Sequence, residues 1–317
     1  MIQIGKWFNK LLAGCILVLS CFLTGNCNNN GSRNTVSDSP SHGTINISVD
    51  ESFKPVIDEQ IKVYEASYPG TRIIAHYKPE AACMKDLLTD TSSRMVIVTR
   101  SLNPKEERYL YDSLNYYPYS EPIATDAIAV IVNINSKDSM FTLSELRNRL
   151  GGAQGKGNTF VFDGLSATGT VRFAMDSILN GKPFDTGVVK AVNNSREVLE
   201  YVASNKDAIG FVGISWIGNP EDSSQVNMLK KVKIAYVKCE HCADSPYVKP
   251  SQMSILTRRY PLVRGLYYIL KENFTGLGAG FAAFMKYERG QLIFRRSYLG
   301  PKMGFAIRSV NLNLEQK

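Results

Sequence analysis

The first part of the chain alternates apolar strands with helical segments, and this order limits the possible folds more than any other feature. Strands are predicted at residues 45–49, 72–77 and 94–99, and each is followed by apolar residues at helical spacing. Strands that alternate with helices form a parallel sheet covered by helices. Ligands of such sheets bind at the carboxyl ends of the strands. We therefore predict an α/β fold with its site in the loops that follow these strands.

The third of these units carries the clearest helix start. Asn103 is a good N-cap residue, Pro104 suits the first helical position, and two glutamates follow where the helix dipole favours negative charge. The two earlier helices are predicted near residues 56–64 and 80–88, and the first of them ends at a Tyr-Pro-Gly turn.

The rest of the chain continues the same pattern. PIATDAIAVIVN, which begins at Pro122, is an apolar strand long enough to pass from one lobe to another. FTLSELRNRL is predicted as a helix capped by Thr142 or Ser144. Further segments are a helix at 194–202, strands at 208–217 and 232–237, an apolar run at 262–270 and an amphipathic segment at 280–294.

Residues 163–173, DGLSATGTVRF, are the best candidate for the functional site. They follow a short strand and lead into an amphipathic helix, whose first N–H groups have no partner within the helix. The turn offers hydroxyl groups and a glycine that permits close backbone approach: Ser166, Thr168, Thr170 and Gly169. Such a turn is suited to an anion, and an ordinary capped helix start is the alternative. Arg172 lies in the first turn, where the dipole disfavours a cation unless negative charge is near.

Composition bounds the class of protein. The 317 residues are 44% hydrophobic and 21% charged, which is ordinary for a globular chain long enough for two domain-sized cores. The formal net charge is +8, which suits an anionic ligand or surface. Because the basic residues form no run, the charge gives little support to nucleic-acid binding, and no nucleic acid is expected as a partner.

The N-terminus is typical of an export signal. Two lysines precede an apolar run at residues 11–23, which is short for a membrane span and suits a cleaved signal. A tract rich in Gly, Ser and Asn follows and is predicted as a flexible tether. We therefore exclude a signal segment at 1–27 and a tether at 28–43 from the fold.

Cys27 lies between the apolar run and the tether, in the position of the lipidated cysteine of bacterial lipoproteins. We predict lipidation of Cys27 and a membrane-anchored protein of the periplasm or cell surface. Asn26 departs from the small residue that usually precedes this cysteine. Cys15, in the sequence LAGC, and Cys21 are the alternative acceptors, although LAGC has no hydrophobic region before it.

Seven short segments follow one another along the chain: SFKP, TRSL, PIATDAIAVIVN, ATGT, AIGFV, YPLVRGLYYIL and ERGQLIFRRSYLGP. Together they resemble the phosphate-binding proteins of ABC importers, the PstS family, in the branch found in Bacteroidetes-type lipoproteins. The resemblance implies a two-lobe type 2 periplasmic-binding-protein fold, in which each lobe is a mainly parallel sheet flanked by helices and two crossover strands join the lobes. It places lobe 1 at 44–126 and 260–317 and lobe 2 at 127–259.

The resemblance also implies which residues bind phosphate. All lie at loop-to-helix junctions that the sequence already marks as candidate anion sites: Ser52, Phe53, Glu80, Ala81, Ala82, Thr99, Arg100, Ser166, Thr168, Gly169 and Thr170. Three features depart from the family. The aspartate that accepts the proton of a monoprotonated phosphate is not at its usual place. The sequence PEAA replaces a turn rich in Ser and Gly and brings a carboxylate to a place where phosphate would lie. Gly164 stands where an arginine is often found, so Arg100 or Arg172 must supply the guanidinium.

A carboxylate that accepts a proton from the ligand decides between phosphate and sulfate. Phosphate carries a proton near neutral pH, whereas sulfate carries none and would leave a buried carboxylate repelled and unpaired. Asp163, Glu80 and Asp50 are the candidate acceptors, and the sequence does not choose among them.

Other motifs predict neither catalysis nor a cofactor. GLSATGT has the spacing of a nucleotide-binding P-loop, but Thr170 replaces the required lysine. The GISWIG stretch around Ser215 is one residue too long for a G-x-S-x-G nucleophile elbow. Cys239 and Cys242 lack a second matching pair, so a local disulfide or free thiols are expected there rather than a metal site.

We therefore expect a monomeric, membrane-tethered solute-binding protein. It captures inorganic phosphate between two lobes and delivers it to the permease subunits of an ABC importer, without catalysis. One alternative is an enzyme that acts on a phosphate-containing substrate in the same cleft, but no set of nucleophile, base and orienting group is recognisable. The other is a surface lipoprotein whose oxyanion pocket has become an interaction module, which the PEAA departure favours.

Overall fold

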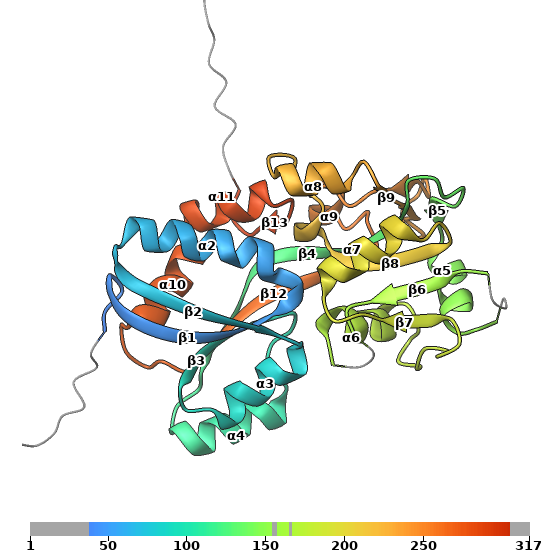
Figure 1. Cartoon of the computed structure of the whole chain (residues 1–317). Helices are drawn as coiled ribbons and strands as arrows, with labels where there is room; N and C mark the ends of the chain where they lie inside the picture. The colour runs from blue at the N-terminus through green and yellow to red at the C-terminus, as the bar shows by residue number, and fades with distance from the viewer. Residues whose placement is uncertain (1–37, 154–156, 165–166, 305–317) are drawn as a thin grey trace, which may run out of the picture. The chain divides into compact units, whose positions relative to one another are not determined.

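A mixed ten-stranded sheet organises the residues that the computed structural model describes, 38–153, 157–164 and 167–304 (Figure 1). All of them belong to one unit that begins at Asp38. The strand order is β2 (Gly70–Lys78), β1 (His42–Asp50), β3 (Ser93–Val98), β12 (Val263–Leu270), β4 (Tyr119–Asn133), β8 (Ala208–Gly213), β6 (Thr159–Phe162) and β7 (Val189–Ala191). Two further strands, β9 (Val232–Ile234) and β13 (Gly300–Pro301), also pair with β4.

The first lobe consists of the elements packed on β1, β2, β3 and β12. β1 pairs in parallel with both β2 and β3, as the strand–helix alternation predicts. β12 runs antiparallel to β3 and makes the sheet mixed. The helices of this lobe are α2 (Lys54–Ser67), α3 (Glu80–Thr89), α4 (Pro104–Leu114), α10 (Leu277–Lys286) and α11 (Glu288–Arg296), and the 3-10 turn η1 (Glu51–Phe53) precedes α2. α4 begins as predicted, because Asn103 and Glu106 form a capping box.

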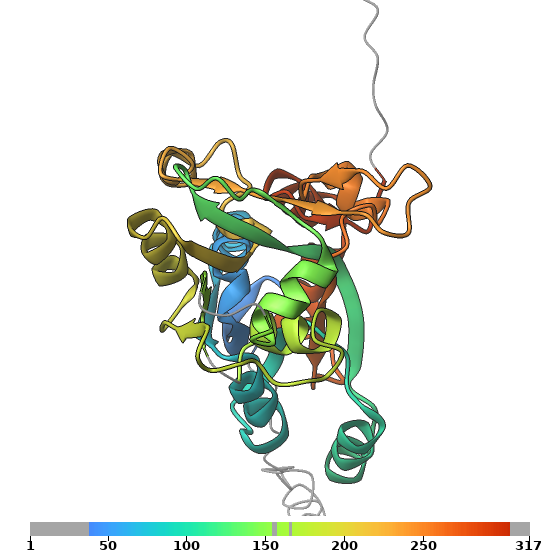
Figure 2. The same ribbon diagram turned by 90° about the vertical axis from the view of Figure 1, so that its right-hand side faces the viewer.

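β4 is the long strand that runs through both halves of the sheet (Figures 1 and 2). It pairs antiparallel with β12 up to Ala127, and from Ile128 onward it pairs antiparallel with β8. Its residues from Ala127 to Asn133 are all buried, which is the pattern of a strand covered on both faces. The predicted passage of this strand from one lobe to the other is confirmed. The lobe boundaries at residues 127 and 260 stay a prediction.

The second lobe consists of the elements packed on β6, β7 and β8, where β6 pairs in parallel with both of its neighbours. The helices between β4 and β12 along the chain are α5 (Leu143–Leu150), α6 (Gly169–Ser177), α7 (Ser195–Ser204), α8 (Ser223–Met228) and α9 (Gln252–Leu256), and the 3-10 turn η2 (Ile214–Trp216) follows β8. Of these, α7 packs on β8, and α9 contacts β4 and β13. A small separate sheet has the order β11 (Tyr247–Val248), β10 (Tyr236–Lys238) and β5 (Met140–Phe141). Thr142, and not Ser144, caps α5.

Three predicted elements differ in their extent. The strand predicted at 232–237 is two strands, because the chain leaves β4 after Ala235 and pairs with β5 from Tyr236. The strand predicted at 208–217 ends at Gly213, where η2 begins. The single amphipathic segment at 280–294 is two helices, with a break at Tyr287 where the backbone is extended.

One main hydrophobic cluster runs through both lobes, and a smaller one lies under α3 and α4. Among the described residues, no helix is long and apolar enough to cross a membrane. The predicted signal segment, the tether and the predicted lipidation site Cys27 lie outside the described residues.

Candidate functional site

The start of α3, the end of β3 and the first turn of α6 meet around the carboxylate of Glu80. The backbone N–H of Thr99 donates to Glu80 Oε2 at 2.9 Å, and the Thr99 hydroxyl donates to the same oxygen. Nε of Arg172 donates to Glu80 Oε1 at 2.6 Å, and Nη2 of Arg172 donates to the Thr99 hydroxyl. Glu80 is only 3% exposed. A backbone amide, a hydroxyl and a guanidinium therefore converge on one buried negative charge.

The N-terminus of α6 contacts a second carboxylate, that of Asp50 at the end of β1. The Gly169 N–H donates to Asp50 Oδ2 at 3.1 Å, while the N–H and hydroxyl of Ser52 donate to Oδ1 at 2.9 and 2.7 Å. A Cβ atom on Gly169 would lie 2.4 Å from Asp50 Oδ2, 2.8 Å from Thr99 Cγ2 and 3.1 Å from Glu80 Oε2. Glycine is required here because the carboxylates of Asp50 and Glu80 both lie close to the Gly169 backbone and leave no room for a Cβ atom.

The N-terminus of α7 repeats this arrangement with Glu51. The hydroxyl of Ser195 donates to Glu51 Oε2 at 2.8 Å, and the Ser195 N–H donates to the same oxygen at 3.2 Å. Free N–H groups and the positive dipole end of a helix both favour such negative charge. Two helices of the second lobe therefore begin against acidic side chains of the loop that follows β1.

The turn that leads into α6 is held by Thr168. Its hydroxyl accepts from the Val171 N–H at 3.2 Å, as an N-cap, and donates to Asp163 Oδ1 at 2.8 Å. Thr170 is fully buried, and within the described part of the chain its hydroxyl has no hydrogen-bond partner. The predicted strand and helix are confirmed, whereas residues 165–166 of the turn between them lie outside the described residues.

A buried ion pair lies beneath the loop after β1. Arg264 on β12 donates from Nε to Asp126 Oδ2 on β4 at 2.7 Å and from Nη2 to the Ser52 hydroxyl at 2.8 Å. Its guanidinium carbon lies 4.8 Å from the centre of the Phe53 ring. Sequence reasoning missed both members of this pair. The available signal was a single charged residue in each of two otherwise apolar strands, PIATDAIAVIVN and LVRGLYYIL.

Burial and charge set the pKa values of these acids in different directions. Burial raises the pKa of Asp50 to about 6, against the opposing charge of Arg264. Burial also raises the pKa of Asp163, although the Thr168 hydroxyl opposes this. Burial acts in the same sense on Glu80, but the hydrogen bond and charge of Arg172 outweigh it and leave the pKa of Glu80 below its ordinary value. Glu80 is therefore the fixed negative charge of the site, and Asp50 is poised to titrate.

Glu51→Gln is expected to reduce the pH dependence of stability. Burial raises the pKa of Glu51 from 4.5 to about 7, against the Ser195 hydrogen bond. Between these values the folded protein binds more protons than the unfolded chain, so the free energy of unfolding falls as the pH rises through this window. Between about pH 5 and 8 the wild-type protein should lose about 2 kcal/mol relative to the glutamine variant, as measured by urea unfolding. An equal change in the two proteins would contradict the assignment.

The remaining predicted ligand residues are placed as follows. The Ala81 N–H donates to the carbonyl of Ala167 at 3.0 Å, and the Ala82 N–H donates to the carbonyl of Pro79. Arg100 makes a two-pronged contact with Glu106, at 2.7 Å for each nitrogen, and therefore does not engage Glu80 as Arg172 does. Ser166 lies outside the described residues. Of the two arginines that the sequence left open, Arg172 contacts Glu80 and Arg100 contacts Glu106. Which of them binds a ligand stays a prediction.

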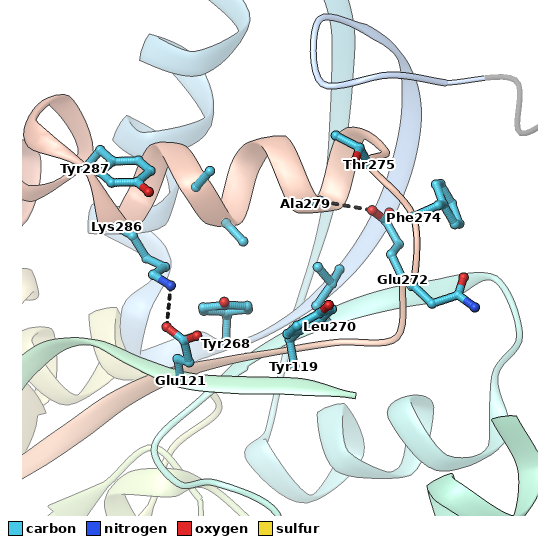
Figure 3. A pocket seen from close by; sticks show the side chains of 13 residues that line it. Tyr119, Glu121, Tyr268, Leu270, Glu272, Phe274, Thr275, Ala279, Lys286 and Tyr287 are labelled. Carbon is cyan, nitrogen blue, oxygen red and sulfur yellow. Dashed lines mark hydrogen bonds and ion pairs between the residues drawn. The ribbon is translucent and has the colours of Figure 1, made fainter. Parts of the chain in front are cut away.

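A pocket of about 330 Å³ lies on the first lobe between β12 and α10, away from these residues (Figure 3). The ammonium of Lys286 and the carboxylate of Glu121 contact each other across its mouth. Glu272, at its other end, accepts from the N–H groups of Gly278 and Ala279 at the start of α10. Arg94 Nε also contacts Glu272, at 3.2 Å, so the charged side chains of this pocket already have partners within the first lobe.

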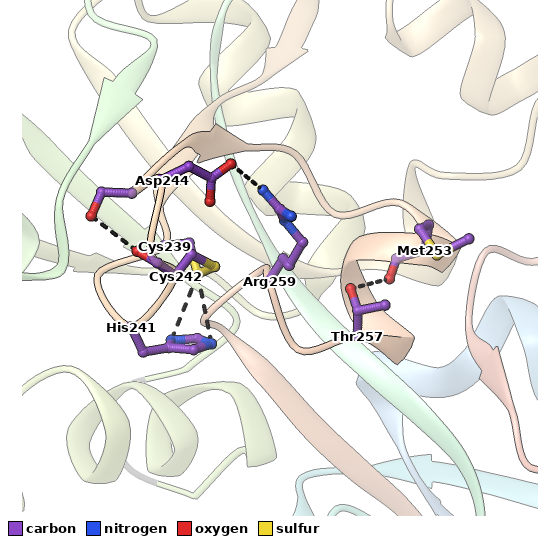
Figure 4. Close-up of a disulfide and its surroundings, with 8 residues drawn as sticks. Cys239, His241, Cys242, Asp244, Met253, Thr257 and Arg259 are labelled. Atoms are coloured by element: carbon purple, nitrogen blue, oxygen red, sulfur yellow. Dashed lines mark hydrogen bonds and ion pairs between the residues drawn. A yellow bond between two sulfur atoms is a disulfide. The ribbon is translucent and has the colours of Figure 1, made fainter.

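Cys239 and Cys242 form a local disulfide (Figure 4). The sequence left open either a disulfide or free thiols at these positions. The ring nitrogens of His241 lie 3.6 and 3.7 Å from Cys239 Sγ. These three residues are close enough to share an ion, but the disulfide engages both sulfur atoms. Metal binding requires thiolates, which the disulfide does not offer.

Two α/β lobes on one mixed sheet, with helix N-termini and strand-end loops meeting between them, define a type 2 periplasmic-binding-protein fold. Residues 34–288 match the model of the PBP superfamily domain, and the chain belongs to this family. The expected fold class is thus confirmed, and the expected lipoprotein branch of the PstS family stays a prediction. Among curated proteins, no sequence matches this chain.

Several solved structures share this fold. A phosphate-bound putative phosphate ABC transporter substrate-binding protein from Clostridium perfringens has a TM-score of 0.67 at 20% identity, covering 82% of this chain and 100% of its own. An ABC-type phosphate transport receptor from Vibrio cholerae has a TM-score of 0.58 at 19% identity, with coverage of 82% and 100%. PstS from Borrelia burgdorferi has a TM-score of 0.51 at 18% identity, with coverage of 82% and 99%.

Proposed function

We propose that this protein is an extracytoplasmic substrate-binding protein that binds inorganic phosphate between its two lobes and delivers it to an ABC importer. One observation carries the proposal: the Thr99 amide and hydroxyl and the Arg172 guanidinium converge on a buried carboxylate, and the Gly169 amide holds another. Such a donor set is suited to an oxyanion, because amides at helix ends and a planar guanidinium fork both match its charge and geometry. The similar structures that bind phosphate or serve phosphate transport support the same ligand.

Phosphate would take the place of the carboxylates that now accept from these donors. Its oxygens would accept from Gly169, Thr99 and Arg172, and the Thr170 hydroxyl offers a further buried donor. The carboxylate of Asp50 or Asp163 would accept the hydrogen bond from its proton, since Asp50 contacts the Gly169 amide and Asp163 contacts the Thr168 hydroxyl at the same turn. Sulfate lacks that proton and should bind less well. The donor set includes no group arranged as a nucleophile with its base, and we propose binding without catalysis.

Titration calorimetry with phosphate, sulfate and molybdate tests this proposal, and two arginine variants sharpen it. Arg172→Lys keeps the charge but loses the planar fork, so phosphate affinity should fall roughly 10- to 150-fold, as expected for the loss of hydrogen bonds to a charged group. Arg100→Lys is the matched control, since Arg100 engages Glu106, and it should leave affinity unchanged. Absence of phosphate binding by the wild-type protein would refute the ligand, and a loss confined to Arg100→Lys would refute the site.

The proposal also covers how the protein is anchored and which proteins it contacts. We propose that lipidated Cys27 tethers the protein to a membrane, that the protein works as a monomer, and that permease subunits of the importer receive the phosphate. The order of apolar run, cysteine and polar tether supports this. Lipid labelling that persists in Cys27→Ser would shift the acceptor to Cys21 or Cys15.

One observation favours a second candidate function. Glu80 already satisfies the donors that a free oxyanion needs. A pocket filled in this way suits a surface lipoprotein that binds another protein and no longer binds a small solute. A wild-type protein that binds none of the three oxyanions in calorimetry, while remaining folded, would favour this alternative.

A further inference from the structure

Three acidic residues of the first lobe each contact a different group of the second lobe. The contacts share one chemistry, in which a carboxylate accepts from the start of a helix or from a side chain in its first turn. They are Asp50 with Gly169, Glu51 with Ser195 and Glu80 with Arg172. We call these the interlobe carboxylate contacts. Since each joins the two lobes directly, together they oppose separation of the lobes.

The contact of Glu80 is the one of the three in which a guanidinium is the donor. Both of its oxygens are engaged, one by Arg172 at 2.6 Å and the other by the Thr99 amide at 2.9 Å. The Glu80 side chain is 4% exposed, whereas that of Arg172 is 37% exposed. Glu80 is thus held in the interior, while solvent still reaches part of the Arg172 guanidinium. An anion from solvent can therefore approach this ion pair from the Arg172 side.

We propose that Glu80 acts as an intramolecular ligand of this site, holding the two lobes together and competing with any oxyanion that enters. An oxyanion that binds the Arg172 Nε–H and the Thr99 N–H must displace Glu80, because each of these single N–H groups now donates to a Glu80 oxygen and like charges repel. Nη1 of Arg172 contacts Asp176 within α6. A solute must therefore replace Glu80 with an equal set of acceptors, which an oxyanion offers and a cation does not. The apparent affinity for an oxyanion is then the intrinsic affinity multiplied by the fraction of molecules in which Glu80 has left.

The lobe-closing part is tested without any added solute and does not depend on phosphate binding. Small-angle scattering of Glu80→Ala should show a larger radius of gyration than the wild-type protein, because Arg172 loses the charged one of its partners across the lobes and keeps the Thr99 hydroxyl. Glu106→Ala is the matched control, since Glu106 makes an equally close carboxylate contact with Arg100 inside the first lobe. It should leave the radius of gyration unchanged. An unchanged radius in folded Glu80→Ala would overturn this part of the proposal.

The competing part rests on the proposed function and is tested by phosphate titration. Glu80→Ala should bind phosphate about tenfold or more tightly than the wild-type protein, while Glu106→Ala should match the wild type. Equal or weaker binding by folded Glu80→Ala would overturn the competition. If Glu80→Ala does not fold, Glu80→Gln removes only the charge. It should then increase the radius of gyration and the phosphate affinity in the same direction, by smaller amounts.

The two failures are distinguishable. If neither wild type nor Glu80→Ala binds phosphate but the variant opens, the proposed ligand is wrong and Glu80 still closes the lobes. If both bind phosphate equally and neither opens, phosphate binding stands and the role of Glu80 is refuted.

Discussion

Gly169→Val is expected to weaken phosphate binding more than any other single change, by roughly 100-fold or more. A Cβ at this position would lie 2.4 Å from Asp50 Oδ2 and 2.8 Å from Thr99 Cγ2, which is too close for either atom. The β-branched side chain would move the first turn of α6 away from β1 and β3, and with it the amide and Arg172. A loss of two hydrogen bonds to a charged ligand, at about 1.5–3 kcal/mol each, gives an effect of at least this size.

Calorimetry with phosphate measures the effect, and Gly157→Val is the matched control. Among the described residues other than its chain neighbours, none has an atom within 4 Å of a Cβ built on Gly157, so the same substitution there should leave affinity intact. Circular dichroism of both variants separates a lost site from a lost fold. Unchanged affinity in Gly169→Val would mean that the DGLSATGTVRF turn is only a helix start.

Arg264→Met should cause the largest loss of stability, about 3–5 kcal/mol in the free energy of unfolding. The Arg264 and Asp126 side chains are 2% and 0% exposed, so removal of the arginine leaves a buried carboxylate without its partner. The same change removes the donor to the Ser52 hydroxyl. Urea unfolding near neutral pH measures the loss.

The exposed pair of Arg259 and Asp244 provides the comparison. Their side chains are 43% and 64% exposed, and Arg259→Met should cost less than about 1 kcal/mol. The double variant Arg264→Met with Asp126→Asn should recover part of the loss, because it also removes the uncompensated charge. A cost in Arg264→Met no larger than in Arg259→Met would show that the buried pair adds nothing to the fold.

The features that the sequence predicted well are local ones. The strand–helix alternation of the first lobe and the capping box at Asn103 depend on neighbouring residues, and both appear as expected. The turn before α6 was found because its hydroxyls and glycine lie within a few residues of one another. The carboxylate that PEAA brings to the site was also recognised from sequence, as a departure from the family.

The features that the sequence did not predict depend on contacts between distant segments. Asp126 and Arg264 are 138 residues apart and meet only because β4 and β12 pair in one register. The choice of Arg172 over Arg100 depends on side-chain directions, since Arg100 turns toward Glu106 in the next helix. The contact of Glu51 with Ser195 likewise needs the two lobes to be brought together. No local pattern specifies such pairings.

The most direct test of the central claim is a crystal structure of the protein at a phosphate concentration that saturates the calorimetric signal. The proposed function and the role of Glu80 together predict phosphate between the Gly169 amide, the Thr99 amide and the Arg172 guanidinium, with the Glu80 carboxylate moved away from Arg172. Phosphate bound elsewhere, with Glu80 still on Arg172 and Thr99, would contradict both the site and the competition.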